Sequence, residues 1–97
     1  MDVRYVFRGL LFEWDEAKAR MNLKKHGVSF ETSCEVFLDP LLVLKNAGDP
    51  DRKTQVVIWE TMDERLLFVV HVVRNGEVIR IISARPVTKP ERREYEG

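Results

Sequence analysis

Cysteine is almost absent from this sequence of 97 residues, which contains only Cys34. A single cysteine excludes a disulfide bond within the chain. Long apolar runs are missing too: residues 1–5 do not begin a signal peptide, and no segment approaches the roughly 18 apolar residues of a membrane span. These absences predict a soluble protein of the cytoplasm, where thiols stay reduced.

An excess of charge of one sign is also absent. Lys and Arg together number 16, and so do Asp and Glu, which gives a formal net charge of +0. A neutral chain has no global field that attracts a polyanion. Any anion-binding site must therefore come from a local arrangement of basic side chains.

The residues that are present suit one folded domain spanning residues 1–97. Hydrophobic residues make up 44% of the chain and charged residues 33%, which is enough for both a core and a solvated surface. Residues 3–12 predict a strand or a hairpin. Asp15 is a good N-cap for a helix from Glu16 to His26, and Gly27 can end that helix in a left-handed conformation.

A second, shorter helix is predicted from Ser29 to Phe37, because Asp39-Pro40 stops it. Strands then follow, and the last helix starts at the capping box that begins with Thr88. The predicted strands are Leu41–Lys45, Thr54–Glu60, Arg65–Arg74 and Glu77–Arg85, with a loop over residues 46–51. The order β-α-α-β-β-β-β-α predicts an α+β fold with a twisted antiparallel sheet packed against the two N-terminal helices.

Asn75-Gly76 is the strongest local signal, because this dipeptide favours a type I′ turn that closes a two-residue hairpin. That turn would place Arg74 opposite Glu77 and His71 opposite Arg80. A symmetric closure of the preceding turn would place Glu60 opposite Arg65 and Thr54 opposite His71. One face of the sheet would then collect Glu60, Arg65, His71 and Arg80, although a shift of one residue would scatter the set.

Each of these residues also has an ordinary structural explanation. Glu60–Arg65 can be a surface ion pair, which contributes less than about 1 kcal/mol. His26, Lys24 and Lys25 can form a solvated helix end that suits the helix dipole. Arg85 can be a surface charge, and Tyr95 can simply pack against the domain.

The motifs of several enzyme classes are missing. There is no glycine-rich phosphate loop, no Cys/His cluster with metal-ligand spacing, and no nucleophile elbow. What remains is Arg, Lys, His, Glu and Tyr, a set that can cleave RNA without a metal ion. RNA supplies its 2′-hydroxyl as the nucleophile, so the protein needs a base, an acid and cations for the phosphorane.

Five segments, in this order and spacing, resemble the BrnT toxin family: FEWD at 12–15, KKHGVSFE at 24–31, VFLDP at 36–40, RIISAR at 80–85 and ERREYE at 91–96. The resemblance implies a RelE-like fold and a ribonuclease toxin of a type II toxin–antitoxin system. It also implies a BrnA antitoxin with a ribbon-helix-helix DNA-binding part, whose complex with the toxin represses their operon.

The resemblance carries over to individual positions. Arg80 and Arg85 match the strand arginines, Arg65 the arginine that opens the preceding strand, and Lys25 and His26 the KHG motif. Tyr95 resembles the C-terminal tyrosine of RelE-like toxins. The chain departs from the family in having eleven residues before Phe12, and in having His71 where Tyr or Phe is expected.

The sequence therefore predicts a metal-independent endoribonuclease without a cofactor. The predicted catalytic residues are Arg65, Arg80, His26, Lys25 and Glu60, and the predicted substrate-binding residues are Arg85, His71, Tyr95 and Lys24. Glu60, His26 and His71 are alternative general bases, and Lys25 is an acid or a phosphate ligand. Two other functions stay open: a non-catalytic interaction or co-repressor module whose polar face docks a partner, and a structural subunit.

Overall fold

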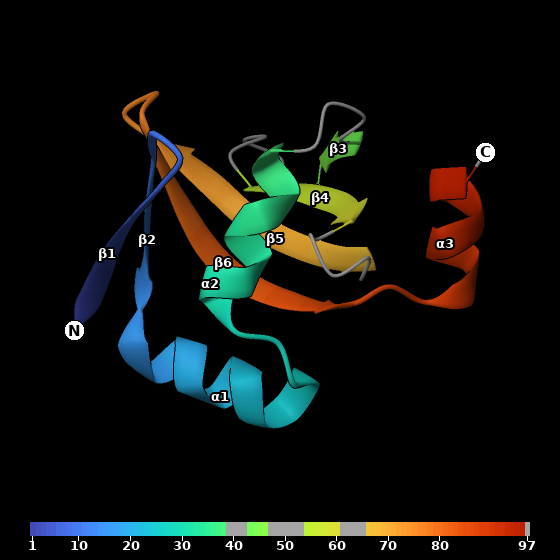
Figure 1. Cartoon of the computed structure of the whole chain (residues 1–97), viewed down its shortest axis with the longest axis horizontal. Helices are drawn as coiled ribbons and strands as arrows, with labels where there is room; N and C mark the ends of the chain where they lie inside the picture. Colours follow the sequence, from blue (N-terminus) through green and yellow to red (C-terminus); the bar gives the residue numbers. More distant parts are fainter. Residues whose placement is uncertain (39–42, 47–53, 61–65, 97) are drawn as a thin grey trace.

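A β-sheet whose described part has six strands forms the centre of the fold (Figure 1). The computed structural model describes residues 1–38, 43–46, 54–60 and 66–96. The elements are β1 Asp2–Phe7, β2 Leu10–Asp15, α1 Glu16–His26, α2 Phe30–Ser33, the 3₁₀ helix η1 Cys34–Leu38, β3 Val43–Asn46, β4 Thr54–Glu60, β5 Leu66–Arg74, β6 Val78–Pro86 and α3 Lys89–Glu96. The predicted α+β class is confirmed.

The strand order is β1-β2-β6-β5-β4-β3. Figure 1 shows α2 crossing one face of the sheet, α1 lying beside β6, and α3 near the C-terminus. None of the helices in the described ranges is long and apolar enough to cross a membrane.

The N-terminal segment is a hairpin rather than one strand, so the predicted element order lacks a strand. Arg8 and Gly9 connect β1 and β2 with positive φ angles of 51° and 83°. β2 then pairs with β6 in parallel, which makes the sheet mixed and the prediction of a purely antiparallel sheet wrong. A parallel neighbour requires a long crossover connection, here formed by the helices and the intervening strands.

The first helix has the predicted bounds because its caps form as expected. The Asp15 carboxylate accepts a hydrogen bond from the backbone N–H of Lys18 at 3.0 Å. Gly27 takes the left-handed conformation with φ 71°, and its N–H donates to the Leu23 carbonyl. The second predicted helix is split: Ser29 caps a single turn of α2, and the chain then tightens into η1.

Most of the predicted strands are found within a few residues of their expected ends. β4 has the predicted bounds, whereas β6 begins at Val78 instead of Glu77. β3 starts at Val43 and includes Asn46, which was predicted to open a loop. Residues 39–42, 47–53, 61–65 and 97 lie outside the described residues, and so do the predictions for Asp39-Pro40, the rest of that loop, and Arg65.

The register of the β5–β6 hairpin differs from the prediction by one residue. Asn75 and Gly76 have φ angles of 55° and 70°, as a type I′ turn requires, and the Glu77 N–H donates to the Arg74 carbonyl. Glu77 nevertheless stays outside the ladder, so Arg74 pairs with Val78. A shift of one residue moves each side chain of a strand to the other face relative to its partner.

Consequently, the predicted pairing of His71 with Arg80 is wrong. His71 pairs with Ile81, and Arg80 pairs with Val72. The β4–β5 register is shifted as well, because Glu60 pairs with Leu66 rather than Arg65, and His71 pairs with Gln55 rather than Thr54. His71 and Arg80 therefore lie on opposite faces, and the predicted polar face of Glu60, Arg65, His71 and Arg80 does not form as a set.

His71 belongs to the core, with 2% of its surface exposed. Its ring meets Phe37 of η1 edge-on, with 4.9 Å between the centroids. Aromatic side chains link β2 to the helices in the same way: Phe12 packs against Phe37, and Trp14 against Phe30. Burial lowers the pKa of His71, and a hydrogen bond with the Val69 backbone opposes this change only in part. Burial thus favours the neutral form of His71, and the side chain offers no surface to a substrate.

The buried imidazole predicts a pH-dependent stability. The unfolded chain takes up a proton at His71 below pH ~6.5, whereas the folded chain resists it, so the free energy of unfolding should fall as the pH drops from 7 to 5. Urea denaturation at several pH values measures the slope of the free energy of unfolding against pH. His71→Phe should flatten it, whereas Met21→Ala, at an exposed position on α1, should not. Equal slopes for wild type and His71→Phe would contradict the assignment.

Candidate functional site

One side chain, Asn22, joins the middle of α1 to the edge of β6. Its Nδ2 donates to the carbonyl of Ala84 at 2.8 Å and to the carbonyl of Val28 at 3.0 Å, and its Oδ1 accepts the N–H of Ala84 at 3.1 Å. β2 pairs with β6 at residues 78–80, and within the described residues no strand pairs with β6 on this side at Ala84. The carboxamide takes the place of that strand, because it carries the donor and acceptor of a peptide group.

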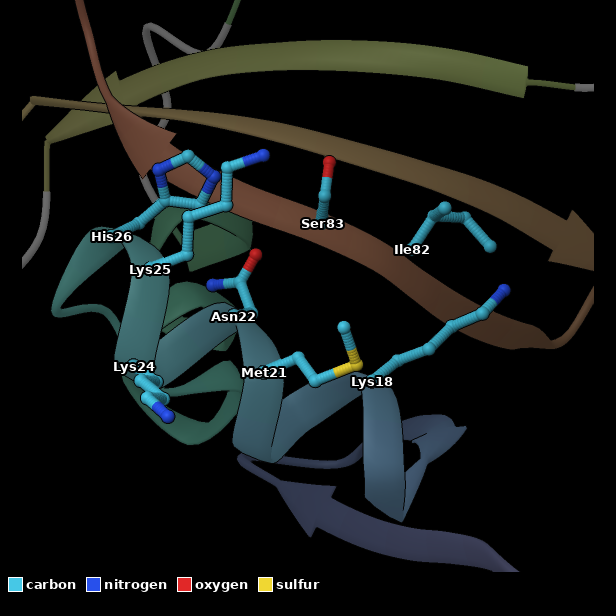
Figure 2. A pocket seen from close by; sticks show the side chains of 8 residues that line it. All are labelled: Lys18, Met21, Asn22, Lys24, Lys25, His26, Ile82 and Ser83. Atoms are coloured by element: carbon cyan, nitrogen blue, oxygen red, sulfur yellow. The ribbon is translucent and has the colours of Figure 1, made fainter.

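A cleft of about 660 Å³ lies between α1 and β6, and Asn22 is one of its lining residues. Residues that line it are Lys18, Met21, Asn22, Lys24, Lys25, His26, Ile82 and Ser83. Figure 2 shows Lys25 and His26 projecting toward Ser83, whereas Lys24 points away from β6. Met21 and Lys18 lie nearer to Ile82. Two motifs that are more than fifty residues apart in the sequence, KKH and RIISAR, therefore meet at one cleft.

The lining of the cleft is basic. Three lysines and a histidine contribute to it, and no carboxylate is among the lining residues in the described part of the chain. Met21 is 70% exposed and adds an apolar surface. The cleft therefore suits an anionic ligand with apolar groups. Among the described residues, no group of three or more His, Cys, Asp or Glu side chains is arranged to hold a metal ion.

A β-bulge in β6 sets the direction of its polar side chains. Arg80 pairs with Val72, Ser83 with Val70, and Arg85 with Phe68, and the register shifts between Val70 and His71. These three partners are alternate residues of β5, so their side chains share one face of the sheet. Arg80, Ser83 and Arg85 lie opposite them and therefore share that face too. In a regular strand, residues five positions apart point to opposite faces. The extra residue of the bulge therefore brings both arginines to the same face as Ser83.

We call this face, which carries Arg80, Ser83 and Arg85, the open face of the sheet. The opposite face carries Leu67, Val69 and His71, which are buried in the core. Ser83 is shared by the open face and the cleft. Ser83 is thus the position at which the face that carries the two arginines meets the cleft beside α1.

Arg80 is held by two carboxylates. Its Nη1 and Nη2 donate to the Asp2 carboxylate at 3.3 and 3.2 Å, and Nη1 lies 3.4 Å from Glu13 Oε1. Glu13 is buried and has a shorter contact with Arg74 Nη1, at 2.8 Å. The Arg80 guanidinium lowers the pKa of Asp2, whose side chain is 52% exposed. Glu13 is therefore the buried counterion of this face, and Asp2 is the exposed one.

Arg85 lies farther along the open face. Its guanidinium carbon lies 4.1 Å from the centroid of the Phe68 ring, and its Nη1 donates to the Pro86 carbonyl at 3.1 Å. The stacking orients a planar group with several N–H donors, which is suited to bind phosphate oxygens.

Of the nine predicted site residues, Lys25 and His26 line the cleft, and Arg80 and Arg85 lie on the open face. Lys24 contributes to the rim of the cleft, and His71 is in the core. Glu60 and Tyr95 lie in β4 and α3, and Arg65 lies outside the described residues. Cys34 is fully buried, and burial raises the pKa of its thiol, which makes it a poor nucleophile.

Three contributors were missed: Asn22, Glu13 and Asp2. Two of them left a signal in the sequence. Asn22 is a poor helix former inside a helix, and Glu13 lies between the aromatic residues Phe12 and Trp14. A polar residue in an apolar setting is one that needs a partner.

Comparisons with known proteins identify the family to which the chain is similar. Residues 14–91 match the family model described as "Ribonuclease toxin, BrnT, of type II toxin-antitoxin system". No curated protein matches the chain. The crystal structure of the Brucella abortus ribonuclease toxin, BrnT, is similar, with 25% sequence identity, a TM-score of 0.66, and coverage of 78% of this chain and 94% of that chain. The matched range includes every residue that lines the cleft.

Replacing Asn22 tests its role as a strand substitute. Asn22→Leu has a similar volume but leaves the N–H and carbonyl of Ala84 without partners in a buried position, so the free energy of unfolding should fall by about 2–4 kcal/mol. Met21→Ala changes an exposed neighbour on the same helix and should cost less than about 1 kcal/mol. Urea denaturation measures both, and a wild-type stability of Asn22→Leu would rule out this role.

Proposed function

The chain belongs to the BrnT family of ribonuclease toxins of type II toxin–antitoxin systems, and on that basis we propose that it cleaves RNA without a metal ion at the cleft between α1 and β6. The observation that carries the proposal is the meeting of Lys25 and His26 with Ser83, on the face that also bears Arg80 and Arg85. Basic side chains near Ser83 can bind the phosphate of a phosphodiester, and a histidine can transfer the protons of its cleavage.

In this mechanism, the RNA backbone runs over β6 with its scissile phosphate at Ser83. Arg80, Arg85 and Lys25 stabilise the charge that builds up on the phosphate oxygens as the phosphorane forms. His26 accepts the proton of the 2′-hydroxyl, and the resulting oxygen attacks phosphorus. The bond from phosphorus to the 5′-oxygen breaks, Lys25 protonates that oxygen, and a 2′,3′-cyclic phosphate remains.

His26 is the base of choice among the three residues predicted for this role. It lines the cleft, whereas His71 is enclosed in the core. Glu60 belongs to β4, which β5 separates from β6. The roles of Glu60, Arg65 and Tyr95 stay predictions from the sequence.

A phosphate that approaches Arg80 competes with Asp2. The carboxylate makes two hydrogen bonds to the guanidinium and is half exposed, so the exchange trades one anion for another. Glu13 keeps Arg80 in position during the exchange because it stays bound to Arg74. Arg80 is thus pre-oriented for phosphate, although Asp2 lowers its availability.

The proposal extends to the partners that the family implies. A toxin of a type II system acts with an antitoxin, and we assign that role to a BrnA-type protein with a ribbon-helix-helix part. Its complex with the toxin represses their operon in the cytoplasm, and operator DNA is bound only through that complex. We also assign the single domain to the RelE-like fold.

Adjacent lysines offer a matched test of the cleft. Lys25 projects toward Ser83 and Lys24 points away from β6, so Lys25→Ala and Lys24→Ala remove the same charge from different places (Figure 2). Lys25→Ala should slow cleavage of a purified RNA by about 10²-fold or more, and Lys24→Ala by only a few-fold. Cleavage by the wild-type protein should persist in EDTA.

Three results of this experiment would count against the proposal. Equal losses in both variants would remove the cleft from the chemistry, and loss of activity in EDTA would show that a metal ion is needed. A folded protein that binds RNA and never cleaves it would favour the non-catalytic interaction module instead.

Asp2→Asn tests the competition at Arg80. Removing the negative charge while keeping the shape of the side chain should tighten RNA binding several-fold at low salt, because Arg80 loses one of its two counterions. Glu16→Gln is the control, since Glu16 is an exposed carboxylate that pairs with Arg20. A fluorescence-anisotropy titration measures both affinities. Equal tightening in both variants would indicate a general charge effect rather than competition at Arg80.

A further inference from the structure

A second hollow, of about 250 Å³, lies on the other side of His26. Its lining includes the apolar side chains of Leu66, Pro86 and Val87, and one cation, Arg92 of α3. His26 lines this hollow and also the cleft between α1 and β6, so the imidazole is a shared wall between two cavities. The hollow contributes nothing to the mechanism given above.

The walls of this hollow are fixed by backbone contacts. The Val87 N–H donates to the Leu66 carbonyl at 3.1 Å, which extends the β5–β6 pairing past Pro86. The Arg92 N–H donates to the Thr88 carbonyl at 2.9 Å in the first turn of α3. On the opposite side, the Asn22 carboxamide holds the Val28 carbonyl just after His26. Strand ends, α3 and the end of α1 therefore converge on His26.

We propose that this hollow is a subsite for the nucleotide that adjoins the cleaved dinucleotide, an inference that rests on the proposed ribonuclease function. The base of that nucleotide lies on the apolar surface of Leu66, Pro86 and Val87, and its phosphate pairs with Arg92. RNA then passes over His26, with the cleaved dinucleotide in the cleft and the adjoining nucleotide in the hollow.

The chemistry of the lining favours a nucleotide over an apolar peptide segment. A nucleotide joins a flat base to a phosphate, and the hollow joins an apolar wall to a guanidinium that can donate several hydrogen bonds. No carboxylate is among its lining residues in the part of the chain that the structure describes. The cleft on the other side of His26 has the same character, so one polyanion can occupy both.

The test uses chimeric oligonucleotides with a single ribose at the cleavable position. The shortest is a dinucleotide with randomised bases, and it is extended with deoxynucleotides on the 5′ side only or on the 3′ side only. Extension toward the hollow should lower the KM of wild-type protein by roughly 5- to 100-fold, which is the range for one stacked and paired nucleotide. Extension on the other side should change the KM only through contacts with the cleft.

Arg92→Ala should abolish the gain from one of the two extensions and leave cleavage of the dinucleotide unchanged. Arg93→Ala is the matched control, because Arg93 is an exposed arginine on the same helix and is not part of the lining. Val87→Asp is a second variant, which places a negative charge in the hollow and should repel the same extension. Binding of a fully deoxy version of each oligonucleotide gives a readout that is independent of cleavage.

The inference is overturned if Arg92→Ala and Arg93→Ala behave alike, or if Arg92→Ala affects both extensions equally while the dinucleotide is still cleaved. That pattern leaves the proposed function intact. If wild-type protein cleaves none of the oligonucleotides or any longer RNA, the proposed function fails, and the subsite fails with it.

Discussion

The pairing of one carboxamide with a strand edge determines the geometry of this protein. Asn22 gives β6 the hydrogen bonds that a neighbouring strand would give, and it also binds the Val28 carbonyl that follows α1. The last turn of α1 is therefore fixed on both sides. This contact therefore sets the position of Lys25 and His26, at the end of α1, relative to Ser83. The candidate site depends on it, although Asn22 itself has no role in the chemistry.

A second constraint acts on the strand that Asn22 binds. The bulge of β6 adds one residue between Arg80 and Ser83, and only this extra residue brings Arg80 and Arg85 to the same face. Glu13 then fixes Arg74 and Arg80 from β2, the strand parallel to β6. The fold therefore shapes the candidate site in two ways. The parallel pairing of β2 with β6 supplies Glu13, the counterion of Arg80. The end of that pairing leaves the edge of β6 at Ala84 available to Asn22.

Local rules predicted the parts of the fold that local interactions determine. Asp15 and Gly27 fixed the bounds of α1 because caps depend on neighbouring residues, and apolar patterns located the strands. The prediction of the register failed because Glu77 stays outside the ladder, which changes the partner of every residue in the hairpin. The residues of the turn alone do not indicate this extra position. Because the predicted register placed Arg80 opposite His71, the face that His71 shares with Leu67 and Val69 was taken as polar, whereas it is the core. The parallel β2–β6 pair and the partners of Arg80 involve contacts across more than sixty positions, which no local pattern specifies. The resemblance pointed to Lys25, His26, Arg80 and Arg85 from motifs alone, so those predictions did not depend on the register.

The central claim is that RNA binds along the cleft between α1 and β6. Nuclear magnetic resonance tests it directly, by titration of the protein with an RNA whose 2′-hydroxyls are methylated so that it is bound but not cleaved. The account predicts that the largest changes in backbone amide shifts fall within residues 18–26 and 80–87, while α2 stays unchanged. Changes concentrated at Phe30–Ser33, or none in the cleft at saturating RNA, would contradict it.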